Sequence, residues 1–342
     1  MNRPTIVDLA KAAGVSVSTV DRVLNARNPV RRATAKRVLE AAEQIGFYAS
    51  NVIKQRLGAD RPTLTFGFLL QQRSRPFYRE LAKALIYAAD QYSEAYVKPQ
   101  VEFLDDLSPQ NVADRMLALS RKVNALAIVS AEHPKITEVI EDAHAREVPI
   151  FALISPLSAP SGAGYVGLDN WKVGRTSAWA FANICKQPGK IGIIVGSHRY
   201  RCQELNEIGF RSYFRENAPD FQLLEPMITF EEKHVASELT HDLLQREPDL
   251  AGLYISGGGI TGVMNTLREA GTAGQLVTVG YELMAETRSA LLDGILTLVI
   301  AHPLERLTST AIALMAEAVT EGGRKPLPNT LLPFDIYTAE NL

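Results

Sequence analysis

Residues 5–25, TIVDLAKAAGVSVSTVDRVLN, predict two short helices joined by a glycine turn. Thr5 and Asp8 have the spacing of a capping box, in which the threonine hydroxyl accepts from first-turn amides. Gly14 ends the first helix because glycine readily adopts the left-handed conformation that a tight turn needs. Ser16 is a suitable N-cap for the second helix. This layout is typical of a DNA-reading helix-turn-helix.

The second helix has an apolar face and a polar face. The expected inward positions are Val20, Val23 and Leu24, and the outward positions are Val17, Ser18, Asp21, Arg22 and Asn25. A third amphipathic helix is expected over residues 33–45, with Val38, Ala42 and Ile45 inward. Three such helices form a small core, which leaves the second helix free to lie in a major groove of DNA.

The basic residues gather at the start of the chain. Residues 1–62 hold eleven lysines and arginines against five aspartates and glutamates, a net charge of +6. The whole chain is −2, so residues 63–342 carry −8. A basic head on an acidic body indicates a polyanion-binding module attached to a second domain. The alternative is a solvated basic helical hairpin with no partner.

Length and composition limit the remaining possibilities. The 342 residues predict two or three folding units, and the apolar fraction of 46% fits a globular core. The two cysteines, Cys185 and Cys202, form no disulfide framework and fit a reducing compartment. The sequence has no CxxC or HExxH motif, so we expect no metal and no cofactor. It shows neither an export leader nor an apolar run of about 18 residues, so we expect a cytoplasmic protein without a membrane span.

Residues 50–62 are predicted to link the head to the body, which gives three segments at 1–49, 50–62 and 63–342. Gly58 and Pro62 frame the end of this stretch. Two alternatives stay open: helical turns that become ordered against DNA and a second copy, or a bare flexible linker.

From residue 63 the pattern changes to strands that alternate with helices. Such alternation predicts an α/β body with right-handed crossovers and parallel sheets, and its length predicts two doubly wound lobes with a ligand crevice between them. The expected strands lie at 64–70, 101–104, 125–129, 149–154, 165–168, 190–195, 223–228, 250–255 and 276–280. The clearest expected helices lie at 77–92, 112–122, 136–146, 174–184, 204–216, 235–245 and 262–270.

Several short motifs, in this order behind this head, carry a specific resemblance. They are RPFY at 75–78, YVGLDNWKVGR at 165–175, IGFR at 208–211, VGYE at 279–282 and GILTLVIAHP at 294–303. Together with residues 5–25 they resemble the lactose-repressor (LacI/GalR) family of bacterial transcription regulators over essentially the full chain. The body is similar to the periplasmic sugar-binding-protein fold.

The resemblance implies a regulator, expected to repress, that binds DNA as a homodimer or larger assembly on a pseudo-palindromic operator. It implies a small effector, such as a sugar or polyol, that binds between the lobes and changes operator affinity. No bond is made or broken, so no enzyme is expected. A periplasmic-type sugar receptor is the alternative, although it would lack the basic head. An enzyme on the same scaffold is a weaker alternative, because the glycine run at 257–259 lacks the GxGxxG spacing of a nucleotide-binding loop.

The resemblance also assigns residues to the operator. It places Val17, Ser18 and Arg22 at base edges, where Arg22 can pair with guanine, and it places Ser16 and Thr19 at phosphates. The remaining positions in the predicted operator-binding set are Asp21, Asn25 and Leu57. Asp21 departs from the family, and either a cytosine amino group or a nearby arginine would compensate its charge. Leu57 is the candidate wedge for the minor groove.

The effector positions implied by the resemblance are Arg75, Phe77, Tyr78, Glu132, Asp169, Asn206, Glu282 and His302. Aromatic faces, carboxylates and amides in such a set are suited to gripping sugar hydroxyls. Asn206 replaces an arginine of the relatives, which argues against borrowing a known effector. Structural alternatives stay open for several positions. These are lobe core for Phe77 and Tyr78, helix N-cap for Asp169, an ordinary loop position for His302 and a solvated carboxylate for Glu282.

Overall fold

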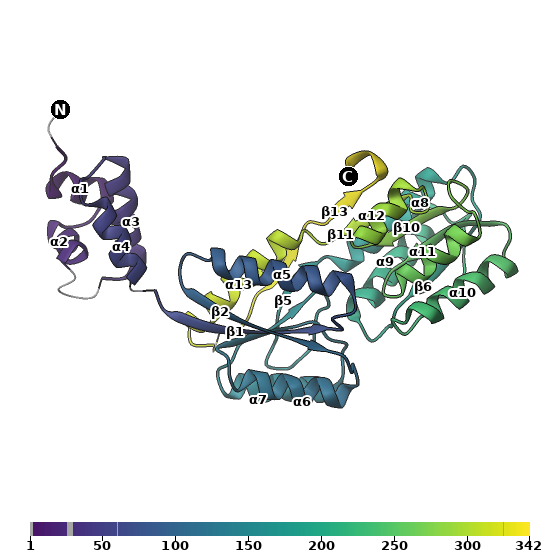
Figure 1. The fold of residues 1–342 in the computed structure, drawn as a ribbon, viewed down its shortest axis with the longest axis horizontal. Coiled ribbons are helices and arrows are strands. Elements are labelled where there is room, and N and C mark those ends of the chain that lie inside the picture. Colours follow the sequence, from purple (N-terminus) through teal and green to yellow (C-terminus); the bar gives the residue numbers. More distant parts are fainter. Residues whose placement is uncertain (1–2, 26–29, 60, 324) are drawn as a thin grey trace. The chain divides into compact units, whose positions relative to one another are not determined.

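The computed structural model describes residues 3–25, 30–59, 61–323 and 325–342. The chain forms two compact units, of which the first comprises Met1–Thr63 with Ser93–Tyr96 and the second comprises Leu64–Tyr92 with Val97–Leu342 (Figure 1). Each unit is described by itself below.

The first unit is helical, with the predicted turn between its first two helices. Its helices are α1 (Ile6–Ala13), α2 (Val17–Asn25), α3 (Arg32–Gln44) and α4 (Ser50–Ala59). The capping box is present, because Thr5 N donates to Asp8 Oδ2 at 2.8 Å and Asp8 N donates to Thr5 Oγ1 at 3.3 Å. Gly14 adopts φ +64°, and Thr19 N donates to Ser16 Oγ at 3.2 Å. Both predicted helix ends are therefore confirmed.

One apolar core joins all four helices of this unit. The predicted inward residues Val20, Val23, Val38 and Ala42 are buried, and Leu24 and Ile45 pack against them from partly buried positions. Ile53 of α4 is fully buried in the same core. Residues 50–59 of the expected linker are thus helical, and one side chain of this helix contributes to the folded head.

The second unit contains two sheets, each covered by helices. The first sheet has the order β12-β5-β4-β3-β1-β2, with β1 (Thr63–Gln71), β2 (Tyr96–Leu104), β3 (Ala125–Ile128), β4 (Ile150–Leu153), β5 (Gly164–Leu168) and β12 (Asn329–Leu332). Strands β12, β5, β4, β3 and β1 pair in parallel. The helices of this first lobe are α5 (Pro76–Gln91), α6 (Pro109–Ser120), α7 (Pro134–Ala145) and α13 (Leu304–Thr320). Figure 1 shows α6 and α7 on one face of the sheet and α5 and α13 on the other.

The second lobe repeats this architecture. Its sheet has the order β13-β11-β10-β9-β6-β7, with β8 also paired to β6. The strands are β6 (Lys190–Val195), β7 (Gln222–Leu223), β8 (Met227–Ile228), β9 (Leu250–Ile255), β10 (Val277–Tyr281), β11 (Leu298–Ala301) and β13 (Asp335–Tyr337). The helices are α8 (Asn170–Ile184), α9 (Arg201–Asn217), α10 (Lys233–Arg246), α11 (Ile260–Glu269) and α12 (Ala285–Leu292), followed by the short 3-10 helix η1 (Ala339–Asn341).

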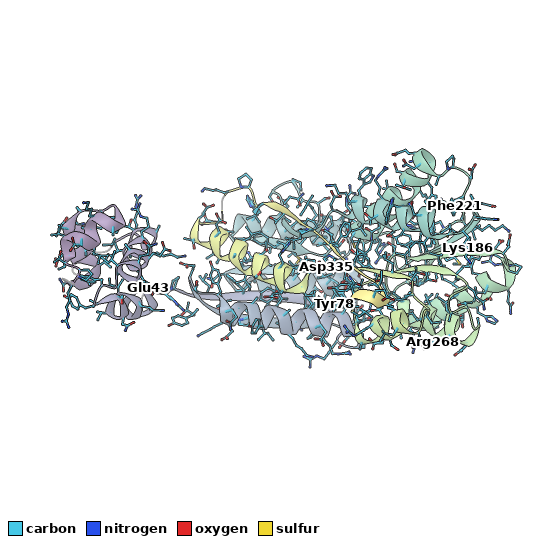
Figure 2. All side chains as sticks on the ribbon, turned by 90° about the horizontal axis from the view of Figure 1, so that it is seen from above. Glu43, Tyr78, Lys186, Phe221, Arg268 and Asp335 are labelled. Atoms are coloured by element: carbon cyan, nitrogen blue, oxygen red, sulfur yellow. The ribbon has the colours of Figure 1, made fainter. Side chains whose placement is uncertain are left out.

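The sheet topology confirms two parallel α/β lobes, but it departs from the expected strands at several places, and β11, β12 and β13 were not expected at all. The run at 223–228 holds two short strands, β7 and β8, and β13 runs antiparallel to β11. The chain passes between the lobes after β5, after β11 and between β12 and β13. These three crossings bring the carboxyl ends of β1 and β10 to a common region. Figure 2 places Tyr78 and Asp335 in the middle of this unit and Lys186, Phe221 and Arg268 toward the far end of the second lobe.

Candidate functional site

A cavity of about 490 Å³ lies between the two lobes of the second unit. The first lobe contributes the ends of β1, β3 and β4 and the start of α5. The second lobe contributes the start of α9 and the loops that follow β8, β9 and β10. Carboxyl ends of parallel strands are the usual place for ligands in open α/β sheets. The volume lies within the range of pockets that bind small molecules.

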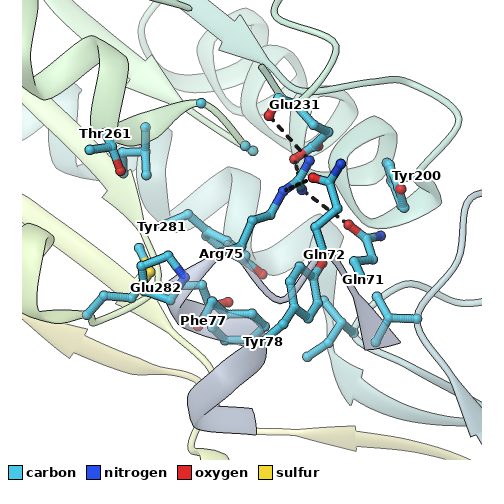
Figure 3. A pocket seen from close by; sticks show the side chains of 18 of the residues that line it. Gln71, Gln72, Arg75, Phe77, Tyr78, Tyr200, Glu231, Thr261, Tyr281 and Glu282 are labelled. Atoms are coloured by element: carbon cyan, nitrogen blue, oxygen red, sulfur yellow. Dashed lines mark hydrogen bonds and ion pairs between the residues drawn. The ribbon is translucent and has the colours of Figure 1, made fainter. Parts of the chain in front are cut away.

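Arg75 reaches across this cavity from the first lobe to the second. Its Nη1 lies 2.8 Å from Glu231 Oε2, and its Nη2 donates to the Glu231 carbonyl oxygen at 3.3 Å. On its own lobe, Arg75 Nε donates to Gln72 Oε1 at 2.9 Å and Nη1 donates to Gln71 Oε1 at 3.2 Å. Figure 3 shows these four side chains drawn together by the ion pair and hydrogen bonds. The guanidinium is therefore held by protein acceptors from both lobes.

Aromatic side chains form another wall of the cavity. Phe77 and Tyr78 follow Arg75 in the first turn of α5, and their rings meet edge to face with centroids 5.3 Å apart. Both line the cavity although each is about nine-tenths buried. Burial raises the pKa of the Tyr78 hydroxyl well above its usual range, and the nearby Tyr200 and Glu231 raise it further. Tyr78 therefore stays a neutral hydroxyl beside an apolar ring face, so this wall offers one polar group and one apolar surface.

Glu282 enters the cavity from the end of β10. It adopts φ +67°, and its N–H donates to the Ile300 carbonyl oxygen at 2.8 Å. His302 lies behind it, with Nδ1 2.5 Å from Glu282 Oε1 and the backbone N–H donating to Glu282 Oε2 at 3.2 Å. The His302 side chain is fully buried and does not line the cavity, so it positions Glu282 from behind.

Two polar atoms of the cavity wall have no hydrogen-bond partner among the described residues. They are the Tyr281 hydroxyl and Glu286 Oε2, both of which are buried. Buried polar groups in folded proteins are nearly always hydrogen-bonded, so an unpartnered pair in a cavity indicates where a ligand or water would bind. Figure 3 shows Tyr281 beside Glu282, on the opposite side of the view from Glu231 and Tyr200.

Four of the eight predicted effector residues line the cavity: Arg75, Phe77, Tyr78 and Glu282. Glu132 lines a smaller neighbouring cavity of about 180 Å³ instead. Asp169 does not line the large cavity, because it is the N-cap of α8 and accepts from Lys172 N at 3.2 Å. Asn206 lies beneath the cavity, fully buried, with its side-chain amide 3.2 Å from Ser256 Oγ.

Several lining residues were not predicted from the sequence. They are Gln71, Gln72, Tyr200, Gln203, Glu231, Tyr281 and Glu286. Glu231 is the most consequential of them, and its only sequence signal is that it follows the apolar run at 223–228. Phe230 and Glu231 both have positive φ, at 51° and 66°. Neither residue type favours this conformation, so the sequence gives no signal for the turn that carries Glu231.

The second helix of the head presents the predicted outward face. Val17, Ser18, Arg22 and Asn25 are exposed, whereas Thr19 and Asp21 are partly buried. Asp21 Oδ1 accepts from Asn25 Nδ2 at 2.6 Å, a contact within α2 that the sequence did not predict. The Ser16 hydroxyl is engaged in capping α2 and in hydrogen bonds with Ser18 and Thr19. Leu57 lies in α4, but its side chain falls outside the described part of the chain.

No helix among the described residues is long and apolar enough to span a membrane. Within the same residues, no group of three or more histidine, cysteine, aspartate or glutamate side chains could hold a metal ion.

Two family models match the chain. The model described as "Bacterial regulatory proteins, lacI family" matches residues 5–50, and the model described as "Periplasmic binding protein domain" matches residues 66–325. Curated relatives include catabolite control protein A of Priestia megaterium, 40% identical over 88 residues, or 26% of each chain. RegA of Clostridium saccharobutylicum and the PurR repressor of Aliivibrio fischeri are 31% and 33% identical over about 40% of each chain. The alignments thus span between a quarter and two-fifths of these relatives.

Solved structures share the fold of the second unit. A periplasmic solute-binding protein of Actinobacillus succinogenes with bound D-allose has a TM-score of 0.72 at 18% identity, over 82% of this chain and 98% of that one. The glucose-galactose binding protein GanP of Geobacillus stearothermophilus has a TM-score of 0.70 at 19% identity, over 81% and 99%. At such identity the likeness establishes the two-lobed fold alone.

Proposed function

The chain belongs to the lacI family of bacterial regulatory proteins and carries a periplasmic binding protein domain, and we propose that it represses transcription from a specific operator under the control of a small effector. The observation that carries the effector site is the cavity of about 490 Å³, whose walls come from both lobes. A ligand that contacts both walls favours one arrangement of the lobes, which is how binding can change a distant equilibrium.

The effector is a sugar or a polyol. Support comes from the Phe77 and Tyr78 rings, the Glu282 carboxylate and the unpartnered Tyr281 hydroxyl on one cavity. Rings cover the apolar face of a sugar, while carboxylate and phenol oxygens bind its hydroxyls. Two of the solved structures with this fold hold D-allose and D-fucose, which agrees with this class of ligand.

The operator is bound by α2 of two copies of the chain on a pseudo-palindrome. Arg22 is exposed on the outward face of α2, where its guanidinium is available for bidentate pairing with guanine. Twofold symmetry in the protein requires matching half-sites in the DNA. The net charge of +6 on residues 1–62 supplies the salt-dependent part of the affinity.

Calorimetry tests the proposal. Purified full-length protein is titrated with a panel of neutral sugars and polyols, with and without an operator recovered by selection from genomic DNA. We expect at least one compound to bind without being turned over and to change operator affinity. The factor by which the effector changes operator affinity must equal the factor by which the operator changes effector affinity. A protein that binds sugar but shows no preference among DNA sequences would instead be a sugar receptor, and turnover would indicate an enzyme.

A further inference from the structure

The ion pair between Arg75 and Glu231 removes two opposite charges from the cavity wall. Their side chains are 19% and 8% exposed, so solvent screens the pair little. Breaking such a pair by removing one partner leaves a mostly buried charge without compensation, which is strongly unfavourable. Each residue therefore determines how the other can interact with a ligand.

The second lobe fixes the Glu231 carboxylate in a socket formed by Gln203, Gly196 and Gly258. Gln203 Nε2 donates to Glu231 Oε1 at 2.6 Å, while Gln203 Oε1 accepts from the N–H groups of Gly196 and Ser197 at 2.8 and 2.9 Å. A Cβ on Gly196 would lie 1.9 Å from Glu231 Oε1, and one on Gly258 would lie 1.6 Å from Oε2. The carboxylate occupies space that only glycine leaves open, so its position facing Arg75 is built into the lobe.

Four of the five N–H donors of the Arg75 guanidinium are engaged among the described residues. Oxygen atoms of Gln71, Gln72 and Glu231 accept its described hydrogen bonds. The second arginine of the cavity wall, Arg79, donates to the backbone carbonyl oxygens of Arg73 and Ser74. An acidic ligand would have to displace Glu231 from its socket to reach Arg75. A neutral ligand instead meets the unpartnered Tyr281 hydroxyl without opposing any charge.

We propose that Glu231 sets the charge selectivity of the cavity at Arg75: by neutralising Arg75 across the lobes, it disfavours acidic ligands there relative to uncharged polyhydroxylated molecules. This inference rests on the proposed function only in taking the cavity as the effector site. Glu231 is thereby a specificity-determining residue that the sequence motifs did not indicate.

The substitution Glu231→Gln tests the proposal because it keeps the size and the hydrogen-bonding capacity of the side chain while removing its charge. Thermal shift and calorimetry compare D-glucose, sodium gluconate and sodium sulfate at constant ionic strength. The wild-type protein should bind neither anion in the cavity. In the variant, Arg75 has no counterion, so gluconate or sulfate should bind and the gluconate-to-glucose affinity ratio should rise about tenfold or more. The control is Glu238→Gln, an exposed position on α10 away from the cavity.

The reciprocal variant keeps the test valid if Glu231→Gln fails to fold. Arg75→Gln leaves the Glu231 carboxylate alone, so D-glucosamine should gain about tenfold or more over D-glucose. The proposal is overturned if wild-type protein binds gluconate as tightly as glucose and Arg75→Gln abolishes that binding. It is also overturned if Glu231→Gln folds yet binds neither anion, or if Arg75→Gln folds yet leaves the glucosamine preference unchanged. If no ligand altered operator affinity, the proposed function would be refuted instead. The preference between charged and neutral ligands would still be measured, because ligand binding raises the melting temperature whether or not it changes operator affinity.

Discussion

Replacing Ile53 by alanine should destabilise the DNA-binding head while leaving the body intact. Ile53 is fully buried among the apolar residues of the first three helices, although it belongs to α4 in the expected linker. Truncating a buried isoleucine to alanine costs about 2–5 kcal/mol, the larger values applying where the core cannot collapse. A unit of roughly 60 residues has a free energy of unfolding of about 3–9 kcal/mol. The substitution therefore removes a large fraction of the stability of the head.

Tryptophan fluorescence separates the two units in this experiment. The chain has two tryptophans, and both Trp171 and Trp179 lie in α8 of the body. Far-UV circular dichroism should show an early loss of helix in Ile53→Ala, while the tryptophan transition keeps its midpoint. Operator affinity should fall at temperatures above the new head transition.

The neighbouring substitution Val52→Ala is a matched control, since Val52 lies in the same helix and is 42% exposed. It should change head stability by less than about 0.5 kcal/mol. If Ile53→Ala melted like the control, α4 would not be packed on the head and the flexible-linker alternative would stand.

Three further outcomes follow from the same structure. Arg22→Ala should lose about 1–3 kcal/mol of operator preference in a filter-binding assay while salt-sensitive binding to random DNA remains, and equal loss on both DNAs would remove its base-reading role. Glu282→Gln should weaken the response to the effector in an induction titration with the melting temperature little changed, because the amide still accepts from His302 N; an unchanged titration would exclude Glu282 from the site. Burial raises the pKa of Cys202 to about 12, so its thiolate is scarce at pH 8 and iodoacetamide should label the half-buried Cys185 first. Labelling of Cys202 should increase as pH rises, and mass spectrometry that found Cys202 modified first at pH 8 would contradict its burial.

The fold follows from local patterns wherever an element carries its own signal. The capping box, Gly14 and the alternating apolar runs each depend on neighbouring residues, and their elements are present. Strands β12 and β13 have four and three residues, and their partners β5 and β11 determine their pairing from elsewhere in the chain. Their sequences contain too few buried positions to indicate a strand without those partners.

The site was predicted where a side chain follows a strand in a resembling motif, as Arg75 and Glu282 do. Asp169 also follows a strand, yet its carboxylate caps α8, which is a local use that sequence cannot distinguish from ligand binding. Asn206 lies one helical turn from Gln203, and Gln203 is the one that reaches the cavity. The rotational phase of α9 depends on its packing against α8, so motif spacing alone could not select between the two.

The charge partition between head and body has a consequence for how the protein responds to ionic strength. Each phosphate contact of the head contributes a slope of roughly −0.9 to the dependence of log affinity on log salt concentration. The Arg75–Glu231 contact is mostly buried, and salt weakens it little. Under the proposed function, a rise in potassium concentration should therefore loosen the protein from its operator while leaving the contact between the two lobes in place.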